Sequence, residues 1–528
     1  MKTKFTSTKT QLTTRHNDSV VQTNMNTMKM TNAMRMKLLC LATFAMAMTA
    51  AHLTAQTFTT LHSFTNADGA LPQAVILSGK TLYGTTYQGG KYGYGVVFAV
   101  NNDGTGFTNL HTFTAVSSFP LYTNSDGAWP QAGLILSGNT LYGTASVGGT
   151  SGDGTVFKVN TDGMGFTNLY SFTGGSDGAS PKAGLILSGN TLYGTAYRGG
   201  TNNNGTVFAV NAHGLGFTNL HTFTALSGSP FPTNSDGANT QAGLILSGNT
   251  LYGTANFGGT NGSGTVFALN TDGTGFTNLH TFASGSFNQQ SYYTNSDGAN
   301  PNGRLVLSGD TLYGTAFTGS TNGSGTVFAV KTNGTGFATL YKFSASGTNS
   351  SGVYTNSDGA NPEGLILSGN TLYGTTSSGS TNGSGTVFAV NTNGTGFTTL
   401  YNFSGSSTNS SGVYTNSDGA NPEGLILSGN TLYGTAPDGG SSGVGTVFSL
   451  SFPPPQLTII SSRANVILTW PTNSLGFSYA GYAFQCTTNL VSPAVWAAVY
   501  PAPVVVNGHN AVTNPVTGTQ QFYRLSSP

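Results

Sequence analysis

Short stretches of alternating or β-branched apolar residues recur along most of the chain, and each is bounded by Gly, Asn, Asp or Ser. One complete unit, residues 236–282, contains four such stretches, with the sequences GLILS, TLYGTA, GTVFAL and FTNLHTF. Each stretch has the composition of a β-strand. The connections Ser-Gly-Asn and Thr-Asp-Gly-Thr-Gly have the length and the residues of hairpin turns. The pattern therefore predicts one four-stranded antiparallel sheet per unit.

The unit recurs at a nearly constant spacing. The tetrapeptide Leu-Tyr-Gly-Thr, which defines repeats 1 to 7, begins at Leu82, Leu141, Leu192, Leu251, Leu312, Leu372 and Leu432. Four-stranded sheets that recur in this way are typical of a β-propeller, in which each blade covers the faces of its neighbours. The sequence therefore predicts an all-β chain with a seven-bladed β-propeller over residues 56–451. A differently wound β-solenoid is the alternative.

The strand pattern is offset at the two ends of the repeat region. A strand of the FTNLHTF type occurs at residues 58–64, before any complete unit, whereas the last unit ends at residue 451 without one. We expect the N-terminal strand to take the outer position in the last sheet and so to close the ring. From the axis outwards, the strand order is then GLILS, TLYGTA, GTVFAV and FTNLHTF.

This strand order places the tight hairpin turns on one face and the long, variable outer-to-inner loops on the other, the long-loop face. Exposed loops on a rigid scaffold often carry binding residues. The loops supply aromatic candidates for ligand binding: Tyr122, Trp129, Phe231, Tyr292, Tyr293, Tyr354 and Tyr414. Aromatic faces beside Asn, Asp and Ser suit neutral sugars. The alternative is that these rings only cover the ends of the blades.

An Asp-Gly pair precedes the innermost strand of every repeat. The seven carboxylates are Asp68, Asp126, Asp177, Asp236, Asp297, Asp358 and Asp418. An Asp in this position closes a turn by accepting hydrogen bonds from backbone N–H groups. The alternative is a Ca²⁺ site, but calcium prefers six to eight oxygen ligands, and one Asp with a neighbouring Asn such as Asn234 or Asn295 supplies too few unless backbone carbonyls join. We expect structural turns and no cofactor.

Residues suited to catalysis occur in places that argue against an active site. His62, His111, His221 and His280 share one outer-strand position with Tyr170, Tyr341 and Tyr401, which indicates packing. Glu363 and Glu423 stand where Gln73, Gln131 and Gln241 occur in other repeats, which indicates variation among repeats rather than a hydrolase pair. We expect a protein that is not an enzyme. The alternatives are a propeller carbohydrate-active enzyme (glycoside hydrolase or lyase) and a purely structural surface protein.

Charge is scarce and unevenly distributed. Only 6% of residues are Asp, Glu, Lys or Arg, and residues 1–55 hold seven of the 17 basic residues but one of the 16 acidic ones. The remainder has 10 basic and 15 acidic residues, a net charge of about −5. A mildly acidic body without a basic stripe argues against nucleic acid as a partner.

The N-terminal segment explains this asymmetry. Arg35 and Lys37 precede an apolar run, residues 38–51, which is followed by small residues up to Ala55. This is the layout of a secretory signal peptide cleaved after Ala55, behind a polar extension over residues 1–33. The run is shorter than the roughly 20 residues that span a bilayer, so we expect no integral membrane span in the mature chain. We expect secretion or display on a bacterial cell surface.

The composition changes again after the repeats. Residues 452–456 form a Pro-rich linker. Residues 457–528 contain five or six strand-like stretches, and the Val466-x-Leu468-x-Trp470 run resembles fibronectin type III-like β-sandwiches. We expect Trp470 in the core of this sandwich. Cys486, the single cysteine after residue 55, is expected to be a buried thiol.

The repeats also resemble a known family. Leu-Tyr-Gly-Thr, Gly-Thr-Val-Phe and the Asp-Gly turn, over residues 57–451, are similar to the GloVer (Gloeobacter and Verrucomicrobia) tandem repeats of the choice-of-anchor proteins. The resemblance implies an exported protein and implies no activity. We expect a monomeric, non-catalytic surface binding or adhesion module that takes polysaccharide or a surface protein on its long-loop face.

Overall fold

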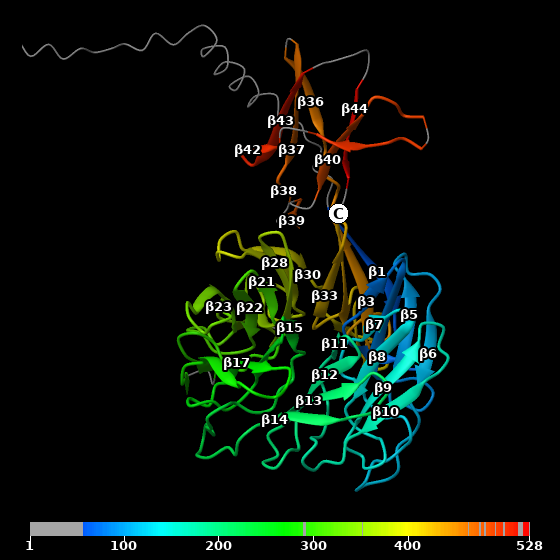
Figure 1. The fold of residues 1–528 in the computed structure, drawn as a ribbon, viewed down its shortest axis with the longest axis vertical. Helices are drawn as coiled ribbons and strands as arrows, with labels where there is room; N and C mark the ends of the chain where they lie inside the picture. The colour runs from blue at the N-terminus through cyan, green and yellow to red at the C-terminus, as the bar shows by residue number, and fades with distance from the viewer. Residues whose placement is uncertain are drawn as a thin grey trace, which may run out of the picture. The chain divides into compact units, whose positions relative to one another are not determined.

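The computed structural model describes residues 56–528 apart from 289–291, 351, 463, 475–476, 480–481, 492, 500–501, 516–520 and 527–528. The expected signal peptide and N-terminal extension lie outside these residues. All regular secondary structure in the described part of the chain is β (Figure 1). No helix there is long and apolar enough to cross a membrane.

Each repeat forms an antiparallel sheet in the predicted strand order. The first strands are β3 (Ile76–Ser78), β7 (Ile135–Ser137), β11 (Ile186–Ser188), β15 (Ile245–Ser247), β21 (Val306–Ser308), β27 (Ala360–Ser368) and β33 (Glu423–Ser428). The second strands are β4 (Thr81–Gln88), β8 (Thr140–Ala145), β12 (Thr191–Ala196), β16 (Thr250–Ala255), β22 (Thr311–Ala316), β28 (Thr371–Ser378) and β34 (Thr431–Ala436). In repeat 1, β2 (Ala70–Pro72) also pairs with β4.

The remaining strands complete these sheets. The third strands are β5 (Val96–Asn101), β9 (Thr155–Asn160), β13 (Thr206–Asn211), β17 (Thr265–Asn270), β23 (Thr326–Lys331), β29 (Thr386–Asn391) and β35 (Thr446–Ser451). The outer strands are β6 (Thr108–Thr112), β10 (Thr167–Ser171), β14 (Thr218–Thr222), β18 (Thr277–Thr281), β24 (Ala338–Lys342) and β30 (Thr398–Asn402), with β1 (Thr57–Ser63) in the sheet of repeat 7. Three short hairpins in the long loops are β19–β20 (Ser286–Phe287 and Tyr293–Thr294), β25–β26 (Gly347–Thr348 and Tyr354–Thr355) and β31–β32 (Ser407–Thr408 and Tyr414–Thr415).

The strand β1 pairs with β35 from Thr57 opposite Ser451 to Ser63 opposite Thr446. Figure 1 shows β1, in blue, among the orange strands of repeat 7, and the sheet has the order β1, β35, β34 and β33. Apolar side chains also bridge the first and last repeats, because Phe64 and Phe98 share one buried cluster with Tyr433 and Val447. The same kind of cluster joins repeats 1 and 2. The repeat region is therefore an all-β, propeller-like fold in which repeat 7 packs against repeat 1.

Close packing explains why the third residue of Leu-Tyr-Gly-Thr is glycine. A Cβ atom at Gly84 would lie 2.6 Å from Cζ of Phe98 and 2.9 Å from Cγ1 of Val75. The same close approach recurs in the other repeats, for example between Gly253 and Phe267. Glycine therefore lets the Phe of the third strand cross the second strand and fill the core.

The C-terminal segment contains two further sheets and a short hairpin. One sheet has the order β36 (Thr458–Ser462), β37 (Asn465–Pro471), β43 (His509–Pro515) and β42 (Val504–Val506). The other has the order β41 (Ala497–Ala498), β40 (Ala483–Thr487) and β44 (Phe522–Ser526), and the hairpin is β38 (Asn473–Ser474) with β39 (Phe477–Ser478). The fibronectin type III-like assignment stays a prediction.

Trp470 is 2% exposed and packs in the core of this segment with Leu468 and Phe484, which confirms its predicted role. The prediction for Cys486 is wrong, because this thiol is only partly buried. Cys486 pairs with Ala497 of β41, a strand of two exposed residues that gives it little cover.

Candidate functional site

The seven predicted Asp carboxylates lie where each long loop returns to its sheet, and their oxygens accept hydrogen bonds from the end of an outer strand. In repeat 4, Asp236 accepts from Nε2 of His221 at 3.0 Å, and from the backbone N–H (3.1 Å) and hydroxyl of Thr224. In repeat 6, the Tyr341 hydroxyl donates to Asp358 at 2.6 Å. This arrangement supports the structural turn.

The hydrogen bonds to these carboxylates also explain why His and Tyr alternate on the outer strand. Both side chains are aromatic, and both can donate to an Asp from the same position. The rings pack as predicted, since His111 stacks on Phe166 of the next sheet with centroids 3.6 Å apart. The hydrogen bond to Asp was missed by sequence reasoning, although the matched seven-fold recurrence of Asp and of His or Tyr was a signal for it.

The neighbouring Asn side chains are already used within the loops. Oδ1 of Asn234 accepts from the N–H groups of Gly237 (2.9 Å) and Gly259 (2.8 Å), and its amide donates to the Thr224 and Gly237 carbonyls. The same pattern occurs at Asn124, Asn295, Asn356 and Asn416. These amides join each long loop to the second-to-third loop of its sheet, so they are poorly available as calcium ligands.

Four of the predicted aromatic residues line one pocket of about 510 Å³, the aromatic pocket. They are Phe231, Tyr292, Tyr293 and Tyr354, from the loops of three consecutive sheets. Phe257 and Phe287 also line it, and both were missed by the sequence reasoning. Their aromatic character in Gly- and Ser-rich loops was the available signal.

The aromatic rings of the pocket differ in exposure and in whether hydrogen bonds hold them in place. Tyr354 is 57% exposed and Phe287 is 61% exposed. Tyr293 is held in place, because its hydroxyl lies 2.7 Å from Oγ of Ser263 and accepts a hydrogen bond from Gly285 N–H. Tyr293 is therefore a wall of the pocket, and Tyr354 and Phe287 are free to contact a ligand.

The other three predicted aromatic residues do not line this pocket. Trp129 is half-buried, and its ring lies 6.0 Å from that of Tyr87 and 5.9 Å from that of Tyr94. Tyr122 lies 6.5 Å from Trp129 in the same cluster. Tyr414 is 68% exposed on its own hairpin. Trp129 thus packs in an aromatic cluster with Tyr87, Tyr94 and Tyr122, apart from the aromatic pocket.

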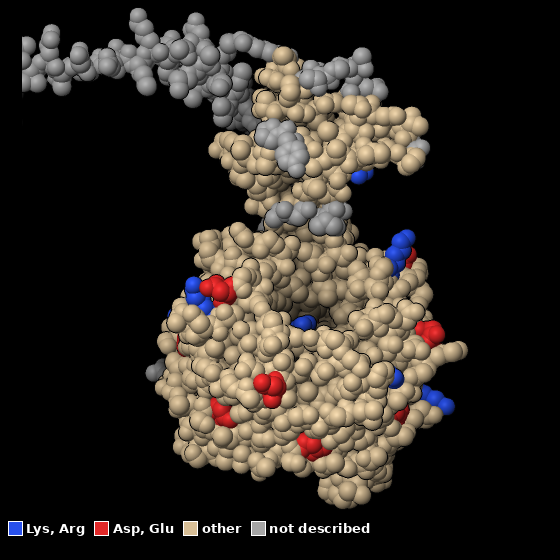
Figure 2. Space-filling view, viewed as in Figure 1, with Lys and Arg blue, Asp and Glu red and all other residues tan. Residues whose placement is uncertain are grey.

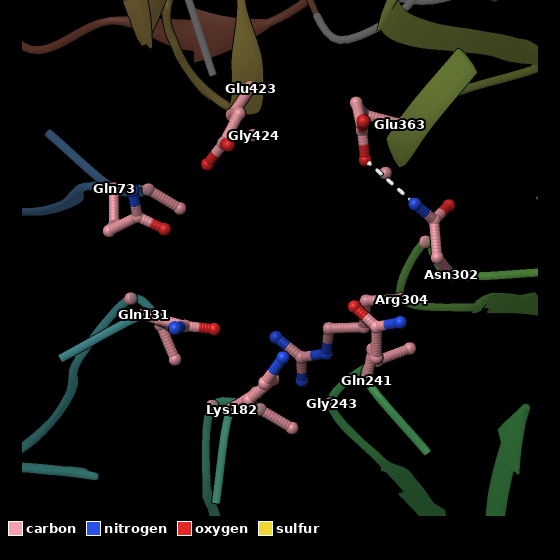
Figure 3. Close-up of a pocket in the computed structure, with 18 of the residues that line it drawn as sticks. Gln73, Gln131, Lys182, Gln241, Gly243, Asn302, Arg304, Glu363, Glu423 and Gly424 are labelled. Atoms are coloured by element: carbon pink, nitrogen blue, oxygen red, sulfur yellow. Dashed lines mark hydrogen bonds between the residues drawn. The ribbon is translucent and has the colours of Figure 1, made fainter. Parts of the chain in front are cut away.

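A second cavity, of about 570 Å³, is lined by all seven repeats. Each repeat contributes the residue at one equivalent position just before or at the start of its first strand: Gln73, Gln131, Lys182, Gln241, Asn302, Glu363 and Glu423 (Figure 3). We call this set the cavity ring. Arg304 also lines the cavity. In Figure 2 the repeat region is hollowed, and a Lys or Arg side chain is visible within the hollow.

The charges of the cavity are separated by sign. Figure 3 shows Glu363 and Glu423 on one side, with Lys182 and Arg304 across the cavity from them. The amide of Asn302 donates to Glu363 at 3.4 Å. Among the residues that the structure describes, no ion pair involves any of these four charged groups.

Burial shifts the titration of these groups. Burial raises the pKa of Glu363 to about 7. Burial, with repulsion from Glu363 and Asp438, raises the pKa of Glu423 to about 8. Burial lowers the pKa of Arg304, and burial together with Arg198 lowers the pKa of Lys182. Perturbed groups that converge on a cavity are typical of functional sites.

The two glutamates should make stability depend on pH. Each carboxyl has a folded-state pKa above its ordinary value of 4.5, so the folded protein holds more protons than the unfolded chain between these values. Their contribution is therefore fully present below pH 4.5 and is lost as the pH rises through 7 to 8. We expect Tm to fall by a few degrees between about pH 5.5 and about pH 8.5. Glu423→Gln, which introduces the side chain of repeats 1, 2 and 4, should flatten this fall, and an unchanged slope in the variant would contradict the assignment.

Several solved structures have a distant likeness to this chain. An oligogalacturonate lyase from Vibrio parahaemolyticus is 11% identical, with a TM-score of 0.43 over 76% of this chain and 98% of its own. A putative 6-phosphogluconolactonase from Bacteroides fragilis is 13% identical, with a TM-score of 0.40 over 85% and 97%. The computationally designed Ika8 protein is 14% identical, with a TM-score of 0.38 over 78% and 96%.

No curated protein matches the chain in a sequence search. The Gloeobacter/Verrucomicrobia repeat profile matches residues 114–290 and again residues 229–406. Together these two matches span more than half of the sequence, and they agree with the motifs recognised in the repeats. The chain belongs to the Gloeobacter/Verrucomicrobia repeat family.

Proposed function

We propose that this is an exported, non-catalytic binding protein, built as a closed seven-bladed propeller, that takes carbohydrate in the aromatic pocket of its long-loop face. The observation that carries the proposal is the convergence of aromatic rings from three repeats on one pocket. Ligand pockets are mostly apolar with a few fixed polar groups, and this pocket has that composition.

The polar groups of the pocket are held by the protein. The amide of Asn361 donates to the Phe317 carbonyl at 3.0 Å, and its oxygen accepts from Ser378 at 2.6 Å. Asn300 is held in the same way by Asn256 and Thr318. Groups fixed in this way lose little entropy when a ligand binds. They would present hydrogen-bonding atoms to sugar hydroxyls beside the exposed faces of Tyr354 and Phe287.

The lining of the aromatic pocket favours binding over hydrolysis. Among its described residues there is no Asp, Glu, His, Lys or Arg. Glycoside hydrolysis in its usual form needs two carboxyl groups that flank the scissile bond. A ligand held in this pocket would therefore meet no general acid or base from the lining.

Three observations support the closed seven-bladed arrangement. The N-terminal strand β1 completes the sheet of repeat 7. Buried residues of repeat 7 pack with those of repeat 1 in the same way as residues of successive repeats do. The cavity ring takes one residue from each repeat.

The double variant Phe287→Ala with Tyr354→Ala is expected to weaken carbohydrate binding at least about ten-fold, because each aromatic ring that stacks on a ligand contributes about 1 kcal/mol. Tm should change by no more than a few degrees, since both side chains are largely exposed. Binding is measured by calorimetry on residues 56–528 against a polysaccharide panel, with release of reducing ends measured alongside.

Tyr414→Ala is the matched control. Tyr414 has nearly the same surrounding sequence as Tyr354 and is similarly exposed, but it lies outside the pocket. It should leave binding unchanged. Equal losses in both variants, or release of reducing ends by the wild-type protein, would refute the proposal.

A further inference from the structure

We propose that the central cavity is a second binding site, separate from the aromatic pocket, for a small zwitterionic molecule that carries a carboxylate and an amine, of the class of amino acids and short peptides. The cavity, with its volume of about 570 Å³, has room for such a molecule. Its lining supplies opposite charges on opposite sides (Figure 3).

The residues that line this cavity differ between repeats, whereas the motif Leu-Tyr-Gly-Thr is the same in all seven. Repeats 1, 2 and 4 have Gln in the cavity ring, whereas repeats 3, 6 and 7 have Lys182, Glu363 and Glu423. Repeat 5 has Asn302, and it also has Arg304 where repeats 2 to 4 have glycine. Since these changes meet in one space, they create a charge pattern that no single repeat contains. This pattern argues against the interpretation of the two glutamates as variation without consequence.

The cationic side suits a carboxylate. Arg304 extends across repeat 4, where a Cβ on Gly243 would lie 3.7 Å from its Cδ. Among the described residues no carboxylate pairs with Arg304 or Lys182, and the Lys182 ammonium lies 4.1 Å from the centroid of the Tyr197 ring. A guanidinium and an ammonium facing one space bind a carboxylate with charge-assisted hydrogen bonds.

The anionic side suits an amine. Glu363 and Glu423 come from adjacent repeats and repel each other, as the raised pKa of Glu423 reflects. The amide of Asn302 holds Glu363 at the cavity by donating to its carboxylate at 3.4 Å. An ammonium group placed between the two carboxyl groups would favour their ionised forms, whose pKa values burial raises to about 7 and about 8, and would replace the repulsion by attraction.

The two sides together select the class of ligand. A simple anion would be drawn to Lys182 and Arg304 but would face the two glutamates. A simple cation would be drawn to the two glutamates but would be repelled by Lys182 and Arg304. A molecule with both charges satisfies both sides at once, and the amides of Gln73, Gln131 and Gln241 can hydrogen-bond its neutral part.

The proposal is tested with a panel of free amino acids, dipeptides and glucuronate, screened by the rise in Tm of residues 56–528. The strongest amino acid or dipeptide is then titrated by calorimetry as itself, as its N-acetyl form and as its C-terminal amide. We expect each blocked form to bind at least about ten-fold more weakly than the free form. Absence of any hit among the amino acids and dipeptides, or equal binding of glucuronate or of a blocked form, would overturn the proposal.

Two variants with side chains taken from other repeats assign the two sides. Arg304→Gly should weaken binding of the free ligand but have little effect on binding of its C-terminal amide, which lacks the carboxylate. Glu423→Gln should weaken binding of the free ligand but have little effect on binding of its N-acetyl form, which lacks the ammonium group. Lys331→Asn is the control, because Lys331 pairs with Asp310 on the exposed surface away from the cavity and five repeats have Asn at this position. Tyr354→Ala should also leave this binding intact, which separates the cavity from the proposed carbohydrate site. If all four variants bind the free ligand like the wild type, the cavity is not the site.

Discussion

Removal of residues 56–64 is expected to lower the free energy of unfolding by more than about 5 kcal/mol, the largest effect that we predict. These residues form the outer strand of repeat 7. Phe64 is fully buried, and Leu61 is 8% exposed. Phe58 stacks on Tyr401 of repeat 6, with centroids 4.2 Å apart. The deletion therefore removes three apolar side chains from two inter-sheet contacts and leaves β35 as an unpaired edge.

Thermal and urea unfolding of chains that begin at residue 56 or residue 65 measure this effect. A synthetic peptide of residues 56–66, added in trans, should restore part of the lost Tm by pairing with β35, and a scrambled peptide should not. An unchanged Tm after the deletion would show that the sheet of repeat 7 does not depend on β1, and it would remove the main support for a closed ring.

The strands and their order could be predicted because each is specified locally. Every repeat carries its own turn residues and its own β-branched stretches, so the four-stranded sheet follows from about 50 residues at a time. The role of β1 was also predictable, because a strand type present at one end and missing at the other identifies its partner. The glycine of Leu-Tyr-Gly-Thr is also explained within one repeat, since it packs against the Phe of the following strand.

The binding sites were less predictable because they depend on how distant loops meet. Tyr354 and Tyr414 have nearly identical surroundings in the sequence, yet only Tyr354 lies in the aromatic pocket, where the loop between repeats 4 and 5 contributes Phe287 and Tyr292. The substitution of Glu for Gln at Glu363 and Glu423 was visible in the sequence. Its meaning was not, because the cavity that joins these residues to Lys182 and Arg304 exists only after all seven repeats have assembled.

Asp236→Ala is expected to cost roughly 1 to 3 kcal/mol of stability. The variant removes the acceptor of the His221 imidazole and of the Thr224 N–H and hydroxyl. The side chain of Asp236 is 7% exposed, so water cannot fully replace these bonds. The equivalent change Asp68→Ala should cost less, because the Asp68 side chain is 26% exposed. His221→Tyr should be tolerated, since Tyr donates to the corresponding Asp in repeats 3, 6 and 7.

The effect of calcium on Tm distinguishes a structural role of these Asp residues from a metal site. A metal that binds only the folded protein adds stability that grows with its concentration. In the described part of the chain no group of three His, Cys, Asp or Glu side chains is placed to hold an ion, and the oxygens of Asp236 already accept hydrogen bonds from His221 and Thr224. We therefore expect the same Tm in millimolar calcium and in EDTA, for the wild type and for Asp236→Ala alike. A rise of many degrees with calcium, lost when several of the seven Asp residues are replaced, would show that the carboxylates bind metal and that their hydrogen bonds in the turns are secondary.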